Sequence, residues 1–502
     1  MRTPLASPLI LSTALALAAC APTTGDPAVA RDGRLQYGSL AFTPCSLATT
    51  GADAVEAQCT TLDVPENHDA PEGRTITLAI AWLPARGLAE DDPIFMIAGG
   101  PGQSALESYP QVDRAFADAR RNRHVVLVDA RGTGGSHPLK CKGADGDNAF
   151  VDANDATPQG AAAFAVRCRD ALSKTTDLRF YGTADHVRDL DLVRRRLGAE
   201  RINLVGISYG TRVAQQYAAR HPGHVRTVVL DSVVPNTLAL GQDHARNLEA
   251  ALETQFARCR DVPACGDSLG DPRRQLDAVR DALRAGGIAP VRFRDPVGGA
   301  WRTEVPQYGD LAALLRMYSY QPLAAATLPL LLHEASEGRY EALLAQSRML
   351  TDSIGDSIMH GMQLSVMCTE DAADMRIDDG DAATVLGNEL VVFSQAQCAV
   401  WPKGARDPAF RTPLAGGVPL LAISGEFDPV TPPRYGDEVV ATLPNARHLV
   451  LPGQGHNVIG AGCMPKLFAQ FVERADASAL DAACLARLSP LPPFAGNHGW
   501  EP

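Results

Sequence analysis

The sequence predicts an α/β fold, with a mostly parallel sheet flanked by helices and a large helical insertion. Short apolar runs without polar alternation recur along the chain, and such runs are typical of strands buried on both faces of a parallel sheet. Helical patterns lie between several of these runs, which indicates that strands and helices alternate. The predicted strands cover residues 76–83, 94–98, 125–128, 202–205, 225–230, 420–423 and 448–451.

Length and composition place the chain among globular proteins. It has 502 residues, of which 45% are hydrophobic and 21% are charged, so the disordered, collagen-like and coiled-coil classes are excluded. The formal net charge of -12 provides no overall positive field that would attract phosphates. We therefore expect no nucleic-acid partner.

Residues 1–20 have the pattern of an export signal. Residues 9–19 form an apolar run that is too short to span a bilayer stably. The segment 17–20, Leu-Ala-Ala-Cys, resembles the lipobox of bacterial lipoproteins, in which the cysteine is lipidated; an ordinary signal peptide is the alternative. With Ala21 in the next position, the resemblance implies membrane attachment through a lipid on Cys20. The implied location is the outer membrane facing the periplasm, or the cell surface.

A polar linker separates this signal from the first part of the predicted sheet domain. Residues 21–39 are rich in Pro, Thr, Gly and Ala and show no periodicity, which predicts a flexible tether. Residues 40–236 contain the first predicted strands and form the first part of the sheet domain. Residues 183–197 carry the clearest helical pattern, because their apolar side chains fall on one face.

An insertion interrupts the sheet domain. Between residues 237 and 410 the strand signal disappears, and this stretch is too long for a loop, so we expect a helical cap. Apolar side chains recur there at helical spacing in residues 311–318, 328–332 and 340–349. The strand pattern then resumes. Residues 411–490 therefore complete the sheet domain, and residues 491–502 form a C-terminal tail.

The cysteines predict disulfide bonds. The chain has 11 cysteines, and setting Cys20 aside leaves ten, an even number that favours disulfides in an exported protein. A zinc site is the weaker alternative, because neither CxxC spacing nor an HExxH motif occurs. Sequence alone leaves the connectivity open. The simplest scheme pairs sequence neighbours: Cys45 with Cys59, Cys141 with Cys168, Cys259 with Cys265, Cys368 with Cys398, and Cys463 with Cys484.

A Gly-x-Ser-x-Gly segment marks Ser208 as a candidate nucleophile. Residues 206–210, Gly-Ile-Ser-Tyr-Gly, directly follow a predicted buried strand and precede a helical stretch, which is the setting that a nucleophile elbow requires. A second match, at residues 266–270, has no buried strand before it. We therefore interpret its Ser268 as a loop residue.

Asp428 and His456 are the candidate partners of Ser208. A serine hydroxyl needs a base and an orienting carboxylate, and in this fold they follow in the order Ser, Asp, His. Asp428 lies just past the strand at 420–423, and His456 follows the strand at 448–451 within a glycine-containing turn. The alternatives considered for the acid are Glu426 and Asp437. His448 is the nearest alternative for the base, although its place at a strand start favours a structural role.

The oxyanion that forms during acyl transfer needs two backbone N–H donors. One is expected from Tyr209, directly after the nucleophile. The other is expected from the glycine-rich turn after the strand at 94–98, where residues 99–102 read Gly-Gly-Pro-Gly. We assign this second donor to Gly100.

Four spaced motifs together resemble the prolyl iminopeptidase and tripeptidyl aminopeptidase family of serine exopeptidases, which has the α/β-hydrolase fold. They are the Gly-Gly-Pro-Gly turn at 99–102, the Asp-Ala-Arg-Gly-Thr-Gly-Gly-Ser stretch at 129–136, the elbow, and the Gly-Glu-Phe-Asp-Pro-Val-Thr-Pro segment at 425–432. Many relatives have a histidine before the first motif, where this chain has Ala98. Because oxyanion binding uses backbone groups, this departure should not abolish catalysis.

The resemblance also implies a substrate and a site for its free amine. The segment 368–371, Cys-Thr-Glu-Asp, is similar to a cysteine-acid pattern near the cleft of tripeptidyl aminopeptidases, so Glu370, and after it Asp371, could bind the substrate's α-ammonium. Ordinary helix-terminal acids beside a disulfide are the alternative. The implied activity is a serine aminopeptidase that releases proline or short peptides from peptide substrates. A carboxylesterase with the same triad and, remotely, a non-catalytic binding lipoprotein are the other hypotheses; no metal or organic cofactor is implied.

Overall fold

The computed structural model describes residues 28–29, 35–143, 149, 157–354, 357–496 and 498–499. The expected signal segment, including Cys20, lies outside the described residues. No helix in the described ranges combines the length and the apolar character needed to cross a membrane.

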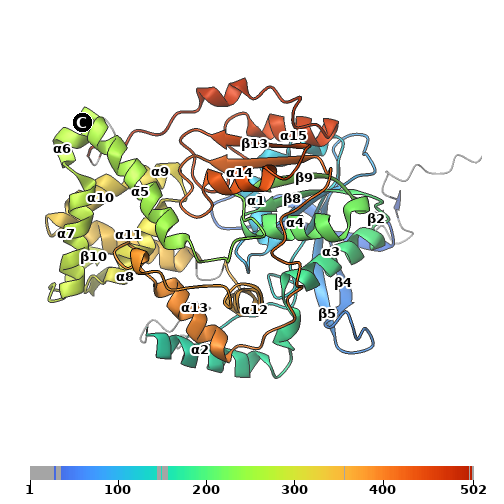
Figure 1. Cartoon of the computed structure of the whole chain (residues 1–502), viewed down its shortest axis with the longest axis horizontal. Helices are drawn as coiled ribbons and strands as arrows, with labels where there is room; N and C mark the ends of the chain where they lie inside the picture. Colours follow the sequence, from blue (N-terminus) through green and yellow to red (C-terminus); the bar gives the residue numbers. More distant parts are fainter. Residues whose placement is uncertain are drawn as a thin grey trace, which may run out of the picture.

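An 11-stranded sheet forms the centre of the molecule (Figure 1). The strand order is β1-β2-β3-β4-β5-β7-β6-β8-β9-β12-β13. The strands are β1 (Ala28–Val29), β2 (Leu35–Tyr37), β3 (Leu40–Leu47), β4 (Val55–Pro65), β5 (Thr75–Leu83), β6 (Ile94–Ile97), β7 (Val125–Val128), β8 (Ile202–Ile207), β9 (Val225–Asp231), β12 (Leu420–Gly425) and β13 (Ala446–Leu451).

The half of the sheet from β7 to β13 is parallel, and the N-terminal half is antiparallel. Strands β7, β6, β8, β9, β12 and β13 all pair in parallel, while β5 joins β7 antiparallel. Every residue of β6, β7, β8 and β12 is buried, which explains their continuous apolar sequences. All seven predicted strands are present, and the predicted α/β class is confirmed.

The structure also corrects the predicted start of the folded chain. Strand β2 lies inside the segment that the sequence assigned to a flexible tether, and it pairs with β3. Ordered structure therefore begins before residue 40. Strands β3 and β4 were not predicted, because buried and exposed residues mix along them and no continuous apolar run results. A three-residue strand such as β2 depends on pairing with its neighbour rather than on a sequence pattern of its own.

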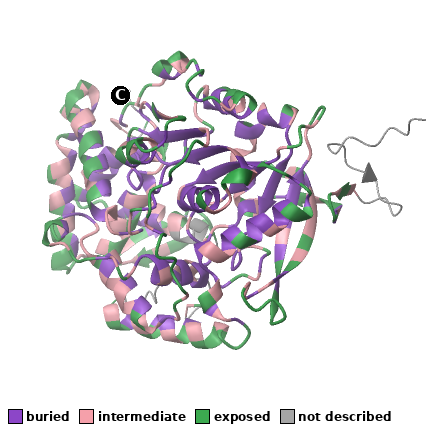
Figure 2. Ribbon diagram, turned by 45° about the vertical axis from the view of Figure 1, so that its right-hand side comes forward, coloured by how far each residue is buried: buried purple, intermediate pink, exposed green. Residues whose placement is uncertain are grey.

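Fifteen α-helices are described, and two groups of them cover the faces of the sheet. They are α1 (Ala105–Phe116), α2 (Pro158–Leu172), α3 (Thr183–Arg196), α4 (Tyr209–Arg220), α5 (His244–Asp261), α6 (Pro263–Leu269), α7 (Pro272–Ala285), α8 (Tyr308–Tyr318), α9 (Pro322–Ala326), α10 (Leu328–Ser336), α11 (Glu341–Ile354), α12 (His360–Glu370), α13 (Glu389–Val400), α14 (Pro433–Val440) and α15 (Met464–Arg474). Helices α3, α4 and α14 share one apolar core with the sheet, and α1 and α15 share the core on the opposite face. Figure 2 shows the buried residues concentrated on the strands between these layers.

The chain between β9 and β12 forms the expected cap, with α5 to α13. Helices α5, α7, α8, α10 and α11 enclose a separate apolar core, which lies beside the sheet domain at the left of Figure 1. Helix α12 instead joins the core of the sheet domain, and α13 packs against α2, a helix from the first part of that domain. The cap is therefore anchored on the sheet domain as well as folded on itself.

Three local features of the cap and tail differ from or extend the sequence predictions. The cap contains an antiparallel hairpin of β10 (Val291–Arg294) and β11 (Trp301–Glu304), whose strands are too short and too exposed to give an apolar run. Ser268 lies in helix α6 rather than in a loop, because Pro263 can begin a helix. Residues of the predicted tail return to the cap, where the Phe494 N–H donates to the Ala326 carbonyl (2.8 Å).

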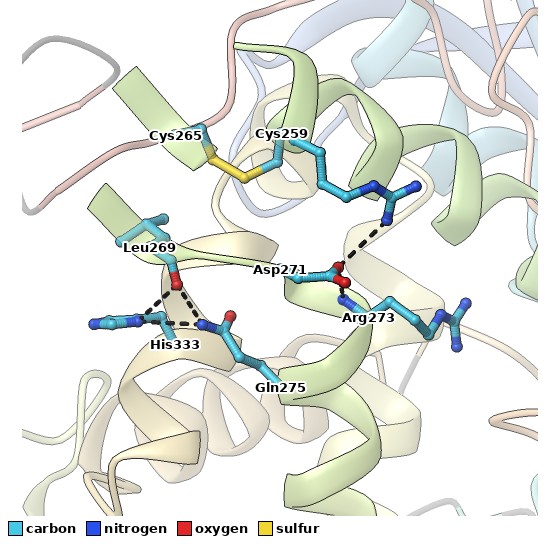
Figure 3. The surroundings of a disulfide bond; sticks show 8 residues. Cys259, Cys265, Leu269, Asp271, Arg273, Gln275 and His333 are labelled. Carbon is cyan, nitrogen blue, oxygen red and sulfur yellow. Dashed lines mark hydrogen bonds and ion pairs between the residues drawn. A yellow bond between two sulfur atoms is a disulfide. The ribbon is translucent and has the colours of Figure 1, made fainter. Parts of the chain in front are cut away.

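The described cysteines form five disulfides, each between sequence neighbours as in the simplest scheme. The pairs are Cys45–Cys59, Cys141–Cys168, Cys259–Cys265, Cys368–Cys398 and Cys463–Cys484. Figure 3 shows Cys259–Cys265, which ties α5 to α6 at the outer end of the cap, beside Asp271 and its hydrogen bonds at the start of α7. The two disulfides of the cap, Cys259–Cys265 and Cys368–Cys398, each close a short loop within it.

Candidate active site

Ser208 occupies a sharp turn between β8 and α4. Its backbone has φ 54° and ψ -121°, a conformation that non-glycine residues rarely adopt and that enzymes use at reactive positions. The flanking glycines make the turn possible, because a Cβ on Gly206 would lie 2.4 Å from the Gly210 carbonyl oxygen. A Cβ on Gly210 would lie 2.3 Å from the Ile97 carbonyl oxygen. The segment therefore has the backbone geometry of a nucleophile elbow.

The two expected oxyanion donors lie beside Ser208. Tyr209 is the first residue of α4, so its N–H has no carbonyl partner within that helix. The glycine turn at 99–102 reaches the serine, since a Cβ added to Gly99 would lie 3.0 Å from Ser208 Cβ. Gly100, with φ 105°, is the next residue of that turn. Both backbone segments thus border the nucleophile.

Asp428 and His456 meet at the same edge of the sheet, past the ends of β12 and β13. His456 Nδ1 lies 2.8 Å from Asp428 Oδ2. Asp428 Oδ1 also accepts the N–H groups of Val430 (2.9 Å) and Thr431 (2.8 Å), and its Oδ2 accepts the Thr431 hydroxyl (2.8 Å). Because an ionised carboxylate can only accept, Nδ1 is the donor, and Nε2 is the ring nitrogen that could accept a proton.

The charge distribution keeps Asp428 ionised and favours a protonated His456. Burial acts to raise the pKa of Asp428, but the positive charge of His456 and the hydrogen bonds from His456, Thr431 and Val430 hold that pKa below its usual value. Burial acts to lower the pKa of His456, but Asp428 and, more weakly, Asp231 raise it overall. The pair is therefore suited to accept a proton and stabilise the resulting imidazolium.

The alternative acids and base have other partners. Asp437 pairs with His448 Nδ1 (2.8 Å), and His448 Nε2 lies 3.0 Å from the Ser424 hydroxyl. Glu426 accepts the N–H of Gly453 (2.7 Å) in the turn that leads to His456. His448 therefore has the structural environment expected for it, and neither alternative acid contacts His456.

Cap residues close over the histidine. The backbone N–H of His456 donates to the carbonyl oxygen of Tyr320 (2.9 Å), which lies in the turn between α8 and α9. The rings of the two residues meet edge to face, with centroids 4.9 Å apart. Gly455 permits this approach, since its Cβ would lie 2.2 Å from the same oxygen. Sequence reasoning missed Tyr320, because the contact joins segments far apart in the chain.

The expected amine-binding acids are engaged elsewhere. Asp371 is fully buried and forms ion pairs with Arg212 (3.0 Å) and Arg411 (2.9 Å), while it also accepts the N–H of Leu240 (2.9 Å). Its charge is therefore neutralised inside the protein. The Asp371 carboxylate thus has two cationic partners within the protein, the buried Arg212 and the partly exposed Arg411, where the sequence predicted a substrate amine.

Glu370 supports Tyr209 through a threonine. Its carboxylate accepts the Thr183 N–H (2.6 Å) and the Thr183 hydroxyl (2.8 Å), and that hydroxyl lies 2.6 Å from the Tyr209 hydroxyl. Because the Thr183 proton goes to Glu370, Tyr209 donates to Thr183. Burial, and secondly the charge of Asp371, raise the pKa of Glu370 to about 7. Both oxygens of Glu370 therefore have partners within the protein rather than facing open space.

The motif at 129–136 holds the surrounding loops. Asp129 accepts the Ser104 hydroxyl (2.6 Å) and the N–H groups of Leu106 (3.0 Å) and Gly135 (2.9 Å), which fixes the start of α1 just after the glycine turn. Arg131 is buried and binds Asp189 on α3. The hydrogen bonds of both side chains go to these loops and to α3, so their role in this structure is to hold the segments around the site.

A small hollow beside the glycine turn lies between the sheet domain and the cap. Gly102 approaches the cap backbone closely, because its carbonyl accepts the Met359 N–H (2.8 Å) and a Cβ on it would lie 2.8 Å from the Met359 carbonyl oxygen. The lining includes Gly99, Gly102, Gln103, His186, Tyr209 and Met362. Across the described ranges, no group of three or more His, Cys, Asp or Glu side chains is arranged to hold a metal ion.

Known proteins are similar in sequence to this chain over most of its length. A family model described as alpha/beta hydrolase fold matches residues 92–461. Serine protease Hip1 of Mycobacterium tuberculosis (strain ATCC 25618 / H37Rv) is 27% identical over 493 residues, which cover 90% of this chain and 92% of that protein. Tripeptidyl aminopeptidase of Streptomyces lividans is 25% identical over 468 residues, which cover 87% of this chain and 85% of that protein.

Two further similarities are to a carboxylesterase and to a solved structure. Carboxylesterase B of Mycobacterium tuberculosis (strain ATCC 25618 / H37Rv) is 28% identical over 438 residues, covering 81% of this chain and 82% of that protein. The crystal structure of proline iminopeptidase from Mycobacterium smegmatis superposes with a TM-score of 0.41 at 18% identity, covering 84% of this chain and 100% of that one. The family match confirms the fold that the four motifs implied. The chain belongs to the alpha/beta hydrolase fold family and is an enzyme of the serine hydrolase type.

Proposed function

We propose that this enzyme is a serine aminopeptidase that releases N-terminal residues, proline or short peptides such as tripeptides, from peptide substrates. The observation that carries the proposal is the Asp428–His456 hydrogen bond at the sheet edge where the elbow presents Ser208. In this assignment Ser208 is the nucleophile, His456 the base and Asp428 the orienting acid.

The reaction then follows from these groups. Ser208 Oγ attacks the scissile carbonyl carbon while its proton passes to His456 Nε2, and the N–H groups of Tyr209 and Gly100 stabilise the oxyanion. His456 next gives that proton to the leaving amine, which leaves an acyl-enzyme on Ser208. Water, deprotonated by His456, attacks the acyl carbon and frees the N-terminal product, and the proton returns to Ser208.

Two observations support a peptide substrate. The relatives over most of the chain include a serine protease and a tripeptidyl aminopeptidase. The cap contacts the base directly through Tyr320 and the glycine turn through Met359, so a substrate must fit beneath it. A covered site of this kind favours chain ends over the middle of a folded protein.

A carboxylesterase is the second candidate, because the same triad cleaves esters and one relative is named carboxylesterase B. The partners of Glu370 and Asp371 support this candidate. Glu370 accepts two hydrogen bonds from Thr183 and Asp371 pairs with Arg212, so neither acid offers a free carboxylate to an amine. Amine recognition therefore has to be measured rather than read from these two residues.

A substrate panel tests the proposal. The chain without residues 1–20 and its Ser208→Ala variant are assayed with Pro, Ala and Ala-Ala-Phe amides, their N-acetylated forms and a short-chain aryl ester. We expect cleavage of the free-amine amides alone, with kcat for Ser208→Ala lower by at least about 10⁴-fold. Turnover of only the ester would establish the carboxylesterase instead, and a fully active Ser208→Ala variant would exclude the proposed nucleophile.

We further propose that the enzyme is exported and anchored through a lipid on Cys20. All ten other cysteines pair in disulfides, which form in oxidising compartments, and Cys20 is the one left over. We expect the full chain to fractionate with bacterial membranes until detergent is added, and Cys20→Ser to fractionate as soluble protein. Equal fractionation of the two would contradict the anchor. Added protease on intact cells distinguishes the cell surface from the periplasmic face.

A further inference from the structure

Asp231 links the nucleophile to the loop that carries the base. It ends β9, the strand beside β8, and its side chain is buried. Its backbone carbonyl accepts the N–H of Ser208 (2.8 Å). Its carboxylate accepts the Val458 N–H (2.9 and 3.0 Å to its two oxygens) and the Ile459 N–H (2.9 Å). One residue therefore holds the backbone of Ser208 and the segment two and three residues after His456.

Ser232 completes this connection. Its hydroxyl accepts the N–H of Asn457 (2.8 Å) and donates to Asp231 Oδ1 (3.2 Å), while its own N–H donates to the Ile423 carbonyl of β12 (2.9 Å). Ser232 has φ 62° and Asn457 has φ 67°. These are left-handed backbone values that residues other than glycine adopt uncommonly. The hydrogen bonds keep both residues in that conformation, so the turn after His456 has a defined shape.

Four titratable groups from different elements lie around His456. They are Asp428 past β12, Asp231 at the end of β9, His244 at the start of α5 and Tyr320 in the cap. Burial, and secondly Arg316, lower the pKa of His244 to about 3, and burial raises the pKa of Tyr320, so both are neutral near pH 7. Two carboxylates therefore supply the negative charge at the imidazole.

The interaction between Asp231 and His456 is reciprocal. Burial raises the pKa of Asp231 to about 6. The hydrogen bonds from the Val458 and Ile459 N–H groups and the positive charge of His456 act in the opposite direction and lower this pKa. Asp231 in turn adds to the raised pKa of His456. At neutral pH Asp231 is thus largely ionised and favours the imidazolium.

We propose that Asp231 is a positioning residue for His456, which fixes the loop after the histidine against the nucleophile strand and provides a second carboxylate that stabilises the imidazolium. The proposal rests on the proposed function, because it assumes that His456 is the base for Ser208. It differs from the role of Asp428, which contacts the imidazole ring directly.

The test is the pH dependence of kcat and kcat/KM for the chain without residues 1–20 and for Asp231→Asn, on the best substrate of the panel. We expect kcat to fall about 10- to 100-fold with little change in KM, because the base loses its placement. We also expect the acid limb of the profile to move about 0.5 to 1 unit to lower pH, since a removed negative charge destabilises the imidazolium and lowers the pKa of His456.

Two further variants separate placement from charge. Ser232→Ala removes the partner of the Asn457 N–H but leaves the Asp231 charge, so kcat should fall while the acid limb stays in place. Asp437→Asn removes the carboxylate that pairs with a different histidine, His448, and should keep the wild-type kcat and profile.

The outcomes that overturn the inference are distinct from those that overturn the proposed function. A wild-type kcat and acid limb in Asp231→Asn, with Ser208→Ala inactive, would exclude the positioning role and leave the triad intact. If Asp231→Asn does not fold, an unchanged kcat in Ser232→Ala would exclude the connection. An active Ser208→Ala variant would instead remove the proposed function on which the inference rests.

Discussion

Replacing Asp428 with asparagine is expected to lower kcat about 10⁴-fold, while KM changes little. In the wild type the carboxylate accepts a hydrogen bond from the His456 Nδ1–H group, so Nε2 carries no proton and can take the one from Ser208. An asparagine can present its NH₂ group there, which favours the opposite tautomer and places a proton on Nε2. The N–H groups of Val430 and Thr431, which Asp428 Oδ1 accepts, would still bind the amide oxygen and orient the side chain, so the fold should survive. Steady-state kinetics on the best panel substrate measure the effect.

Glu426→Gln is the matched control, because Glu426 lies two residues earlier and binds Gly453 rather than His456. We expect this variant to retain activity within about tenfold of the wild type, since an amide oxygen can still accept the Gly453 N–H. The assignment of Asp428 would be wrong if the two variants behaved in the reverse way, or if Asp428→Asn lost less than about tenfold in kcat.

The clearest strand predictions are those in which both faces of the strand are buried. Strands β6, β7, β8 and β12 are buried on both faces, so nearly every residue is apolar and the pattern is visible in one sequence. Strands β3 and β4 have a mixture of exposed and buried residues, and β10 and β11 form a small exposed hairpin. Their pairing depends on neighbouring strands, which a local pattern does not show.

The candidate site divides in the same way. Ser208, Asp428 and His456 could be named as candidates because each follows a predicted strand in a short motif. Asp231 could have been found by the same signal, since the apolar run at 225–230 leads directly into it. Its role was invisible because its partners, Val458 and Ile459, lie 227 and 228 residues later.

Glu370 and Asp371 show what such a local signal leaves out. A pair of acids near a cysteine suggested a free carboxylate, but their environment comes from Thr183, 187 residues earlier, and Arg212, 159 residues earlier. Local sequence thus locates groups at strand ends, whereas the partners that decide whether an acid is free come from distant segments.

Replacing Arg131 with alanine is expected to destabilise the protein by about 3–5 kcal/mol, the usual cost of leaving a buried charge without its partner. Arg131 and Asp189 are both 0% exposed and bind through two 2.7 Å contacts. The guanidinium also donates to the carbonyls of Glu66 (2.7 Å), Phe180 (2.7 Å) and Pro65 (3.2 Å), which would lose their donor as well. Denaturant unfolding with the disulfides intact measures the loss.

Two further variants test whether the stability loss of Arg131→Ala comes from the burial of its ion pair. Arg114 pairs with Asp53 at 3.2 Å, but their side chains are 92% and 90% exposed, so Arg114→Ala should change the free energy of unfolding by less than about 1 kcal/mol. A double variant, Arg131→Met with Asp189→Leu, removes both charges and should be more stable than Arg131→Ala, because no buried carboxylate remains unpaired. If Arg131→Ala were no more harmful than Arg114→Ala, His68, whose Nε2 lies 2.8 Å from Asp189 Oδ1, would be a sufficient partner for that carboxylate. The Arg131 guanidinium would then contribute less to holding residues 65–66 and Phe180 than its hydrogen bonds indicate.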